Sequence, residues 1–154
     1  MNRENMAHFS GEELTSLFLK QSLIDSEADF KSSLSYPDFP HWDCIIITAS
    51  NDSQAEEYEA QLSLRKGQGT LPCSTDFIVV PDKDNRRVGS AGSTLTVIRR
   101  LKEKYGEFAN KKFLVIHAGG NSSRTPQYSA MGKLFSPIPT VLNGFPATIF
   151  DMFL

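Results

Sequence analysis

Two cations and a pair of glycines in the second half of the sequence are of the residue types that bind phosphate. Gly119 and Gly120 are followed by Arg124 and, further on, by Lys133. Glycine has no Cβ, so its backbone N–H group can approach an anion closely, and arginine and lysine supply fixed positive charge. Small size and further hydrogen-bond donors come from Ala118, Asn121, Ser122 and Ser123. Residues 118–133 are therefore predicted to bind phosphate, and we call this segment the phosphate cradle.

Two better-known phosphate-binding loops do not match the cradle. The dinucleotide fingerprint requires G-x-G-x-x-G, which residues 119–124 do not satisfy. The P-loop requires G-x-x-x-x-G-K-[ST], but Gln127 stands at its first glycine and Leu134 at its final Ser or Thr. Taken alone, the two cations also have ordinary interpretations. An arginine beside a turn is often a surface residue, and a lysine before apolar residues often lies along them with its charge in water.

Three short apolar runs are typical of parallel strands that are buried on both faces. They are Cys44–Thr48, Phe77–Val80 and Phe113–Ile116. A helix is expected after the first run, from a capping box at residues 53–56 until Gly67, and another after the second run, until Gly106. This alternation predicts an α/β fold with a Rossmann-like parallel sheet and flanking helices.

Right-handed connections bring the turns after the three strands to one edge of the sheet, where ligands bind in open α/β folds. These turns are residues 48–52, 89–94 and 117–124. In the first turn, Asn51 and Asp52 either cap the following helix or contact the ligand. His117 ends the third strand, and we expect it to support the core or the site rather than to catalyse.

The turn at residues 89–94 is rich in glycine and hydroxyl groups. Its candidate binding residues are Gly89, Ser90, Gly92, Ser93 and Thr94. Such a turn, when it opens a helix, presents unpaired N–H groups and the positive end of the helix dipole, which favours an anion. A tight turn in which Ser93 is the N-cap would have the same composition. The residues alone leave both interpretations open.

The two ends of the chain carry different patterns. A capping box at residues 10–13 predicts a helix from about Gly11 to Ile24, followed by a surface loop to Trp42. We assign residues 1–41 to this helix and loop, packed on the core, and residues 42–154 to the main domain. Residues 134–138 are expected to run towards the core, and residues 148–154 resemble the first turns of a helix cut short. Such an end exposes apolar surface, so self-association through the C-terminal end, or disorder of the last residues, is expected.

The composition is that of one globular domain, with 154 residues, 40% hydrophobic and 22% charged. A net charge of -2 predicts no general affinity for nucleic acid. Cys44 and Cys73 form no C-x-x-C pair, and the histidines lack zinc-ligand spacing. No apolar run is long enough to span a membrane, so no membrane partner is expected. The plain expectation is a cytoplasmic protein with reduced cysteines.

Several motifs in the chain occur in the order known from one enzyme family. They are Trp42-Asp43, Ile45–Ala49, Pro81-Asp82, Gly89–Thr94, His117–Gly120, Ser122, Arg124, Pro126, Ser129 and Gly132-Lys133. The cradle is similar to the sugar-nucleotide pyrophosphorylase signature A-G-G-x-G-T-R with a later Lys, although Ser122-Ser123 replaces Gly-Thr. From Trp42 to the end, the chain resembles the fucose-1-phosphate guanylyltransferase family, which includes bifunctional L-fucokinase/GDP-fucose pyrophosphorylases.

This resemblance implies a fold of the nucleotide-diphospho-sugar transferase type and a reaction of GTP with L-fucose 1-phosphate that gives GDP-L-fucose and pyrophosphate. It implies that Arg124 and Lys133 are catalytic, Arg124 stabilising the departing pyrophosphate and Lys133 bridging phosphates, with Mg²⁺ as the cofactor. Residues 118–123 and 89–94 would bind the nucleotide. Because enzymes of this kind continue well past the cradle, the chain is expected to be an N-terminal part of a longer enzyme, inactive or nearly so alone. The rival interpretation is a non-catalytic module that binds a nucleotide or sugar phosphate.

Overall fold

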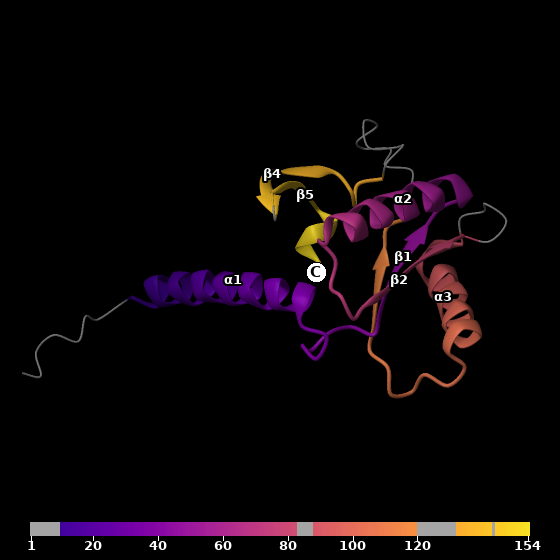
Figure 1. The fold of residues 1–154 in the computed structure, drawn as a ribbon, viewed down its shortest axis with the longest axis horizontal. Coiled ribbons are helices and arrows are strands. Elements are labelled where there is room, and N and C mark those ends of the chain that lie inside the picture. Colours follow the sequence, from indigo (N-terminus) through magenta and orange to yellow (C-terminus); the bar gives the residue numbers. More distant parts are fainter. Residues whose placement is uncertain (1–9, 83–87, 120–131, 143) are drawn as a thin grey trace, which may run out of the picture.

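The computed structural model describes residues 10–82, 88–119, 132–142 and 144–154. Helices and strands alternate along the chain, as Figure 1 shows. They are α1 (Gly11–Ser35), β1 (Cys44–Ala49), α2 (Asp52–Gln68), β2 (Asp76–Pro81), α3 (Gly89–Tyr105), β3 (Phe113–His117), β4 (Pro137–Leu142), β5 (Phe145–Thr148) and the 3₁₀ turn η3 (Phe150–Met152). The three predicted strands are thus present, and the first two are each followed by the expected helix. Only β1 is fully buried: β2 and β3 are the edge strands of the sheet and are mostly half-buried, so the prediction that Phe77–Val80 and Phe113–Ile116 are buried on both faces is wrong.

Strand β1 is the centre of a three-stranded parallel sheet of order β2-β1-β3. All six of its residues are buried, because both of its edges are paired and both of its faces are covered. Side chains alternate along a strand. Ile47 and Ala49 therefore pack against α2 and against the C-terminal segment, by which we mean the described residues after Lys133. Cys44 and Ile46 pack against α3 on the other face. Helices therefore flank the sheet on both faces, and the expected Rossmann-like α/β fold is confirmed (Figure 1).

Helix α2 begins at the carboxyl end of β1, and its first residues are capped by Asn51. The Asn51 side chain accepts a hydrogen bond from the Gln54 N–H at 2.9 Å, so the capping interpretation of Asn51 is confirmed. The predicted capping box at residues 53–56 is wrong, because the helix has already begun at Asp52. The predicted end at Gly67 is also wrong: Gly69, with φ 65°, adopts the left-handed conformation that ends the helix.

Helix α1 begins as predicted but is longer than predicted. Ser10 and Glu13 form both hydrogen bonds of the capping box, at 3.3 and 2.7 Å. The helix continues to Ser35, so the loop predicted over residues 25–35 is wrong. Pairs four residues apart stabilise this part locally, for example the 2.7 Å ion pair between Lys31 and Glu27.

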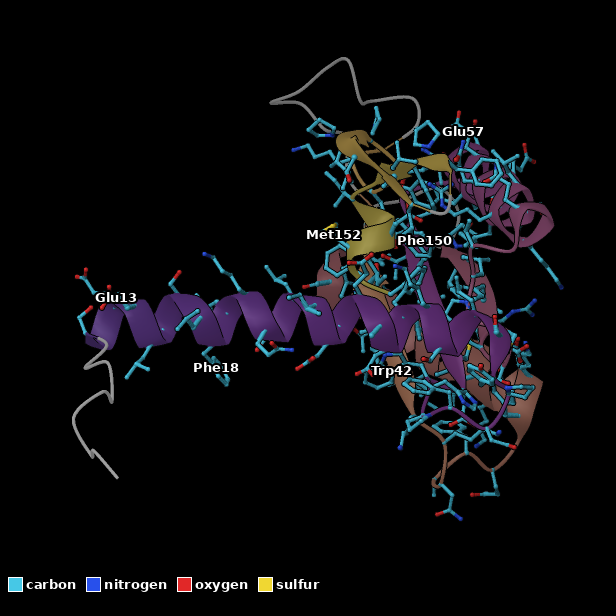
Figure 2. All side chains as sticks on the ribbon, turned by 60° about the vertical axis from the view of Figure 1, so that its left-hand side comes forward. Glu13, Phe18, Trp42, Glu57, Phe150 and Met152 are labelled. Carbon is cyan, nitrogen blue, oxygen red and sulfur yellow. The ribbon has the colours of Figure 1, made fainter. Side chains whose placement is uncertain are left out.

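Most of α1 extends away from the sheet, as Figures 1 and 2 show. Phe30 is its buried residue, whereas Phe18 is 71% exposed and Leu23 69% exposed. Near the end of the helix, the Ser33 carbonyl accepts a hydrogen bond from the Cys73 N–H at 3.0 Å. The expected packing of this helix on the core is therefore confined to its last turns. None of the described helices is long and apolar enough to cross a membrane.

The C-terminal segment forms a hairpin and a 3₁₀ turn rather than the predicted start of an α-helix. Strands β4 and β5 pair antiparallel, and η3 follows directly. The Asp151 carboxylate accepts hydrogen bonds from the Thr148 N–H at 2.6 Å and the Thr148 hydroxyl at 2.7 Å, which closes this tight turn. Phe150 is fully buried, and Leu134 and Phe135 lie in the core as expected.

A buried ion pair joins this segment to α2. Arg65 Nε lies 3.0 Å from the Asp151 carboxylate, and both side chains are only 6% exposed. Arg65 also donates to Thr148 at 2.8 Å, and its guanidinium lies 5.0 Å from the ring centroid of Phe135. Burial alone would raise the pKa of Asp151, but the hydrogen bonds from Arg65 and Thr148 outweigh it, so the pKa is lower than its ordinary value of 3.8.

Asp151→Ala is expected to lower the free energy of unfolding by about 3–5 kcal/mol, because it leaves the Arg65 charge buried without a partner. Urea unfolding measures this. Because the folded pKa of Asp151 is lowered, its stabilisation is present above pH 3.8 and disappears as the pH falls through the folded pKa. The difference between the variant and the parent chain should therefore shrink in acid. Glu103→Ala, which breaks an exposed pair with Arg100, is the control and should change stability by less than about 1 kcal/mol.

Candidate functional site

The carboxyl ends of the three strands lie side by side at one edge of the sheet. Thr48 of β1 is in register with His117 of β3, and Ala49 with Pro81 of β2. Just past the strands, the Asp82 N–H donates to the Ala49 carbonyl at 2.8 Å. The structure thus brings the first turn, the start of α3 and the start of the cradle to a common edge, as the right-handed connections predicted.

The first described residues of the cradle lie against the end of β1. A Cβ at Gly119 would lie 3.1 Å from the Ser50 backbone nitrogen and 3.2 Å from the Ala49 carbonyl carbon. Both neighbours are backbone atoms, so a larger residue here would have to displace the chain by a few tenths of an ångström. The remaining predicted residues of this loop lie outside the described part of the chain; they are Gly120, Asn121, Ser122, Ser123 and Arg124. Their roles stay predictions.

The far end of the cradle is anchored by the core. Leu134 is 6% and Phe135 3% exposed, and both follow directly after Lys133, which is itself exposed. None of the described carboxylates forms an ion pair with Lys133. Lys133 is thus an exposed cation at the point where the chain enters the core.

Helix α3 begins earlier than the N-cap interpretation of Ser93 requires. Its first residue is Gly89, with φ 71°, and its N-cap is Val88, whose side chain has no hydrogen-bond acceptor. Ser90, Gly92, Ser93 and Thr94 therefore lie inside the first turns. The alternative of Ser93 as N-cap is wrong.

A carboxylate that the sequence analysis did not single out as a binding residue organises the start of α3. Asp82 is 8% exposed and accepts a hydrogen bond from the Ser93 hydroxyl at 2.6 Å and a longer one from the Val88 N–H at 3.4 Å. Its negative charge already lies beside the positive end of the helix dipole, which weakens the case for a second anion bound there. The signal for Asp82 was its place directly after a predicted strand, but its role depends on where α3 begins.

His117 links the cradle to α3 and is not a core residue. It is exposed, and its Nε2 lies 3.4 Å from the Thr94 hydroxyl, which also donates to the Ser90 carbonyl at 2.8 Å. The end of β3 and the first turns of α3 are therefore in direct contact, so candidate residues from two separate motifs belong to one surface.

The described residues contain no group of three or more His, Cys, Asp or Glu side chains that could hold a metal ion. Among the described carboxylates, Asp82 and Asp52 follow most closely after the carboxyl ends of the parallel strands, Asp82 after β2 and Asp52 after β1. Mg²⁺ is usually held by one or two carboxylates together with substrate phosphates rather than by a cage of protein ligands. Within the described residues the two carboxylate oxygens of Asp82 accept one hydrogen bond each, and a carboxylate oxygen has lone pairs for more, so Asp82 fits such a role.

The parallel sheet, its flanking helices and the turns at its carboxyl edge define a Rossmann-like α/β protein. The family model of the fucose pyrophosphorylase domain matches residues 106–153, which include β3, both described ends of the cradle and the C-terminal segment. The resemblance to the fucose-1-phosphate guanylyltransferase family is thereby confirmed for this part of the chain.

Curated relatives extend the similarity upstream. The chain is 40% identical over 121 residues to the bifunctional fucokinase/GDP-fucose pyrophosphorylase of Arabidopsis thaliana, covering 65% of this chain and 12% of that protein. It is 38% identical over 99 residues to the fucose-1-phosphate guanylyltransferase of Mus musculus, covering 64% of this chain and 17% of that protein. The human fucose-1-phosphate guanylyltransferase is 37% identical over 99 residues, with 64% of this chain and 16% of that protein covered. The chain thus spans only a small part of the length of these relatives, and no solved structure matches it.

Gly119→Ala is expected to lower the free energy of unfolding by about 1–3 kcal/mol, because the new Cβ would press on the backbone at the end of β1 and the buried strand resists displacement. Thermal or urea unfolding measures the change. Gly67→Ala is the matched control: a Cβ there meets nothing within 4 Å, so the change should stabilise helix α2 by about 0.5–1 kcal/mol. A Gly119→Ala chain as stable as the parent would refute the packing argument.

Proposed function

We propose that this chain is part of a nucleotidyltransferase that joins GTP and L-fucose 1-phosphate to give GDP-L-fucose and pyrophosphate. The observation that carries the proposal is the match of the fucose pyrophosphorylase domain to residues 106–153, which hold the described ends of the cradle. The names of the relatives supply the sugar and the base. The geometry supports it, because both ends of the cradle converge at the edge of the sheet where ligands of open α/β folds bind.

The proposed chemistry is a displacement at phosphorus. A phosphate oxygen of the sugar phosphate forms a bond to the α-phosphorus of GTP, and the bond from that phosphorus to the leaving pyrophosphate oxygen breaks. The attacking phosphate is already an anion near neutral pH, so no general base is needed. The protein's contribution is positioning and neutralisation of charge. In this proposal Lys133 and Arg124 contact the phosphates, and backbone N–H groups of the cradle bind the triphosphate.

We propose Mg²⁺ as the cofactor, with Asp82 as the described carboxylate that would help to hold it. When bound, the ion neutralises charge on the triphosphate. Asp82 is suited to this because hydrogen bonds from Ser93 and the Val88 backbone fix its carboxylate beside the start of α3. A carboxylate held in this way orients a ligand without needing to reorganise.

The alternative is a module that binds a nucleotide or sugar phosphate without turnover. The described features that suit phosphate binding, which are the two ends of the cradle and the exposed Lys133, would serve such a module equally well. Binding and turnover therefore need separate tests.

Arg124→Ala and Lys133→Ala are each expected to weaken Mg-GTP binding by about 1.5–3 kcal/mol, the scale of a hydrogen bond to a charged group. Titration calorimetry measures the affinity. Lys133 is exposed, so its replacement should leave the unfolding midpoint unchanged. Lys102→Ala, in the last turn of α3 and away from the edge, is the control. If either cradle variant binds as tightly as the control, that cation is not in the site.

A pyrophosphate-release assay with GTP and L-fucose 1-phosphate separates the two proposed functions. Release that depends on both substrates, and that is lost in Lys133→Ala, is expected for the transferase. Because the chain spans only 12–17% of the length of these relatives, the release expected from it is small. Saturable GTP binding with no release would favour the binding module.

We also propose a cytoplasmic location, supported by the exposed free thiol of Cys73, since such thiols persist in reducing compartments. Self-association through the C-terminal end stays a prediction. It is supported by Met152 and Phe153, which are 69% and 51% exposed.

A further inference from the structure

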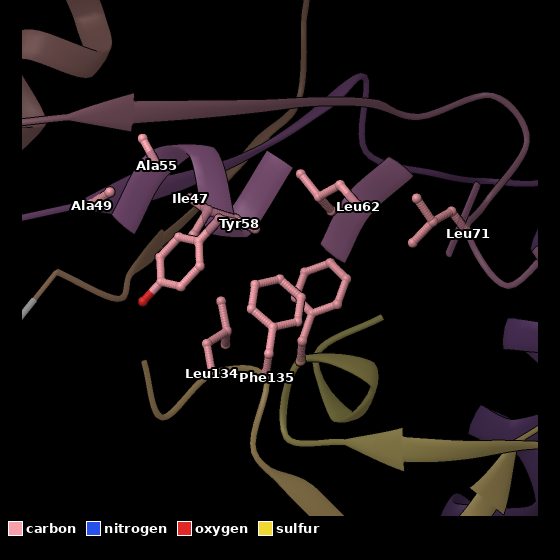
Figure 3. Packing of buried hydrophobic residues seen from close by; sticks show 9 residues of the cluster. Ile47, Ala49, Ala55, Tyr58, Leu62, Leu71, Leu134 and Phe135 are labelled. Atoms are coloured by element: carbon pink, nitrogen blue, oxygen red, sulfur yellow. The ribbon is translucent and has the colours of Figure 1, made fainter. Parts of the chain in front are cut away.

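One buried tyrosine reaches both described ends of the phosphate cradle. Tyr58 lies in the middle of α2, is 0% exposed and belongs to the core cluster that covers β1. Figure 3 shows its ring beside Leu134 and Phe135, with the hydroxyl directed away from the helix. Its ring centroid lies 5.3 Å from that of Phe135 at an interplanar angle of 56°. The position of the hydroxyl is therefore set by core packing and not by the cradle itself.

At the first end of the cradle, the Tyr58 hydroxyl donates a hydrogen bond to the Ala118 carbonyl at 3.3 Å. Ala118 directly follows β3, and Gly119 after it packs on the end of β1. The hydrogen bond is long for an O–H donor, but it joins residues 60 positions apart in the chain. It fixes the direction in which the chain leaves β3.

At the other end, Gly132 lies against the same hydroxyl. A Cβ on Gly132 would lie 2.1 Å from the Tyr58 oxygen and 2.9 Å from the ring carbon that carries it. Gly132 also has a φ of 66°, in the left-handed region that favours glycine. Any side chain at this position, one residue before Lys133, would therefore collide with the tyrosine.

The Tyr58 hydroxyl stays a neutral donor over the whole working range of pH. Burial, and then the nearby Glu57 carboxylate, raise the pKa of Tyr58 to about 12. A neutral group near the phosphates would neither repel them nor bind them as a charge. Its contribution is geometric.

We propose that Tyr58 is a positioning residue that sets the separation of the two ends of the cradle and thereby holds Lys133 at the triphosphate. The hydroxyl binds one end and limits the approach of the other. Tyr58 touches neither substrate in this proposal. The inference rests on the proposed function, because the separation of the two ends of the cradle matters only if the cradle binds phosphate.

The test is Tyr58→Phe, which keeps the ring in the core and removes only the hydroxyl. We expect Mg-GTP affinity, measured by titration calorimetry, to fall roughly two- to tenfold, the range expected for loss of one neutral hydrogen bond. Tyr105→Phe is the matched control. It also removes a tyrosine hydroxyl, hydrogen-bonded to Asp76 at 2.6 Å where β2 begins, at the opposite edge of the sheet. Its affinity for Mg-GTP should equal that of the parent chain.

A double-variant cycle with Lys133→Ala separates positioning from general stability. If Tyr58 acts by placing Lys133, removing the hydroxyl should weaken binding less once Lys133 is gone. Parental affinity in Tyr58→Phe, equal losses in Tyr58→Phe and Tyr105→Phe, or full additivity with Lys133→Ala would each overturn the role of Tyr58 while leaving the proposed function intact. No Mg-GTP binding by the parent chain would overturn the proposed function, and the role of Tyr58 with it.

Discussion

The structure depends on the complete burial of β1. A strand with no exposed residue must have hydrogen-bonded neighbours on both edges and apolar cover on both faces, because an unpaired backbone group away from water is costly. Parallel pairing with β2 and β3 meets the first requirement. Parallel pairing also places all three carboxyl ends at the same edge. The location of the candidate site therefore follows from the way in which the backbone groups of β1 are hydrogen-bonded.

The need for apolar cover on both faces of β1 explains why the segment after the cradle is part of the core. Helix α2 covers only part of one face of β1, and Leu134, Phe135 and Phe150 complete the cover. Figure 3 shows Leu134 and Phe135 on the side of Tyr58 and Leu62 of α2. The chain must therefore return to the sheet after the cradle, and Lys133 stands at the point of return. Apolar burial in this way fixes both ends of a polar loop.

Much of the fold could be predicted from local patterns, and the errors have identifiable physical causes. Uninterrupted β-branched runs such as Ile45–Ile47 predicted buried parallel strands, and the right-handed connection rule then predicted the shared edge. The end of the chain was misassigned as an α-helix because pairing with β4 and the contact between Asp151 and Arg65, 86 residues apart, override local propensity. Helix α1 was predicted too short because its later turns are stabilised by polar pairs rather than by an apolar face.

In the candidate site, too, local patterns predicted some features, and others depend on the tertiary structure. Gly119 was predicted from its type and spacing, but its close approach to β1 depends on tertiary structure. Asp82 could not be recognised from spacing alone, because its partners Ser93 and Val88 are defined only once α3 begins at Gly89. The residues from Gly120 to Arg124 remain known from the sequence pattern alone.

The exposed part of α1 has a consequence for how the molecule unfolds. From its capped start to the turns before Phe30, this helix is stabilised by local hydrogen bonds and not by burial, and such segments open at lower free energy than a packed core. Loss of helical circular dichroism should therefore precede loss of the sheet. The single tryptophan, Trp42, lies just before β1 and shares a pocket with Phe30 and Ser33, so its emission reports on the sheet and the end of α1 rather than on the exposed first turns of the helix. The two spectroscopic transitions need not coincide, and a single two-state free energy describes the sheet but not the whole chain.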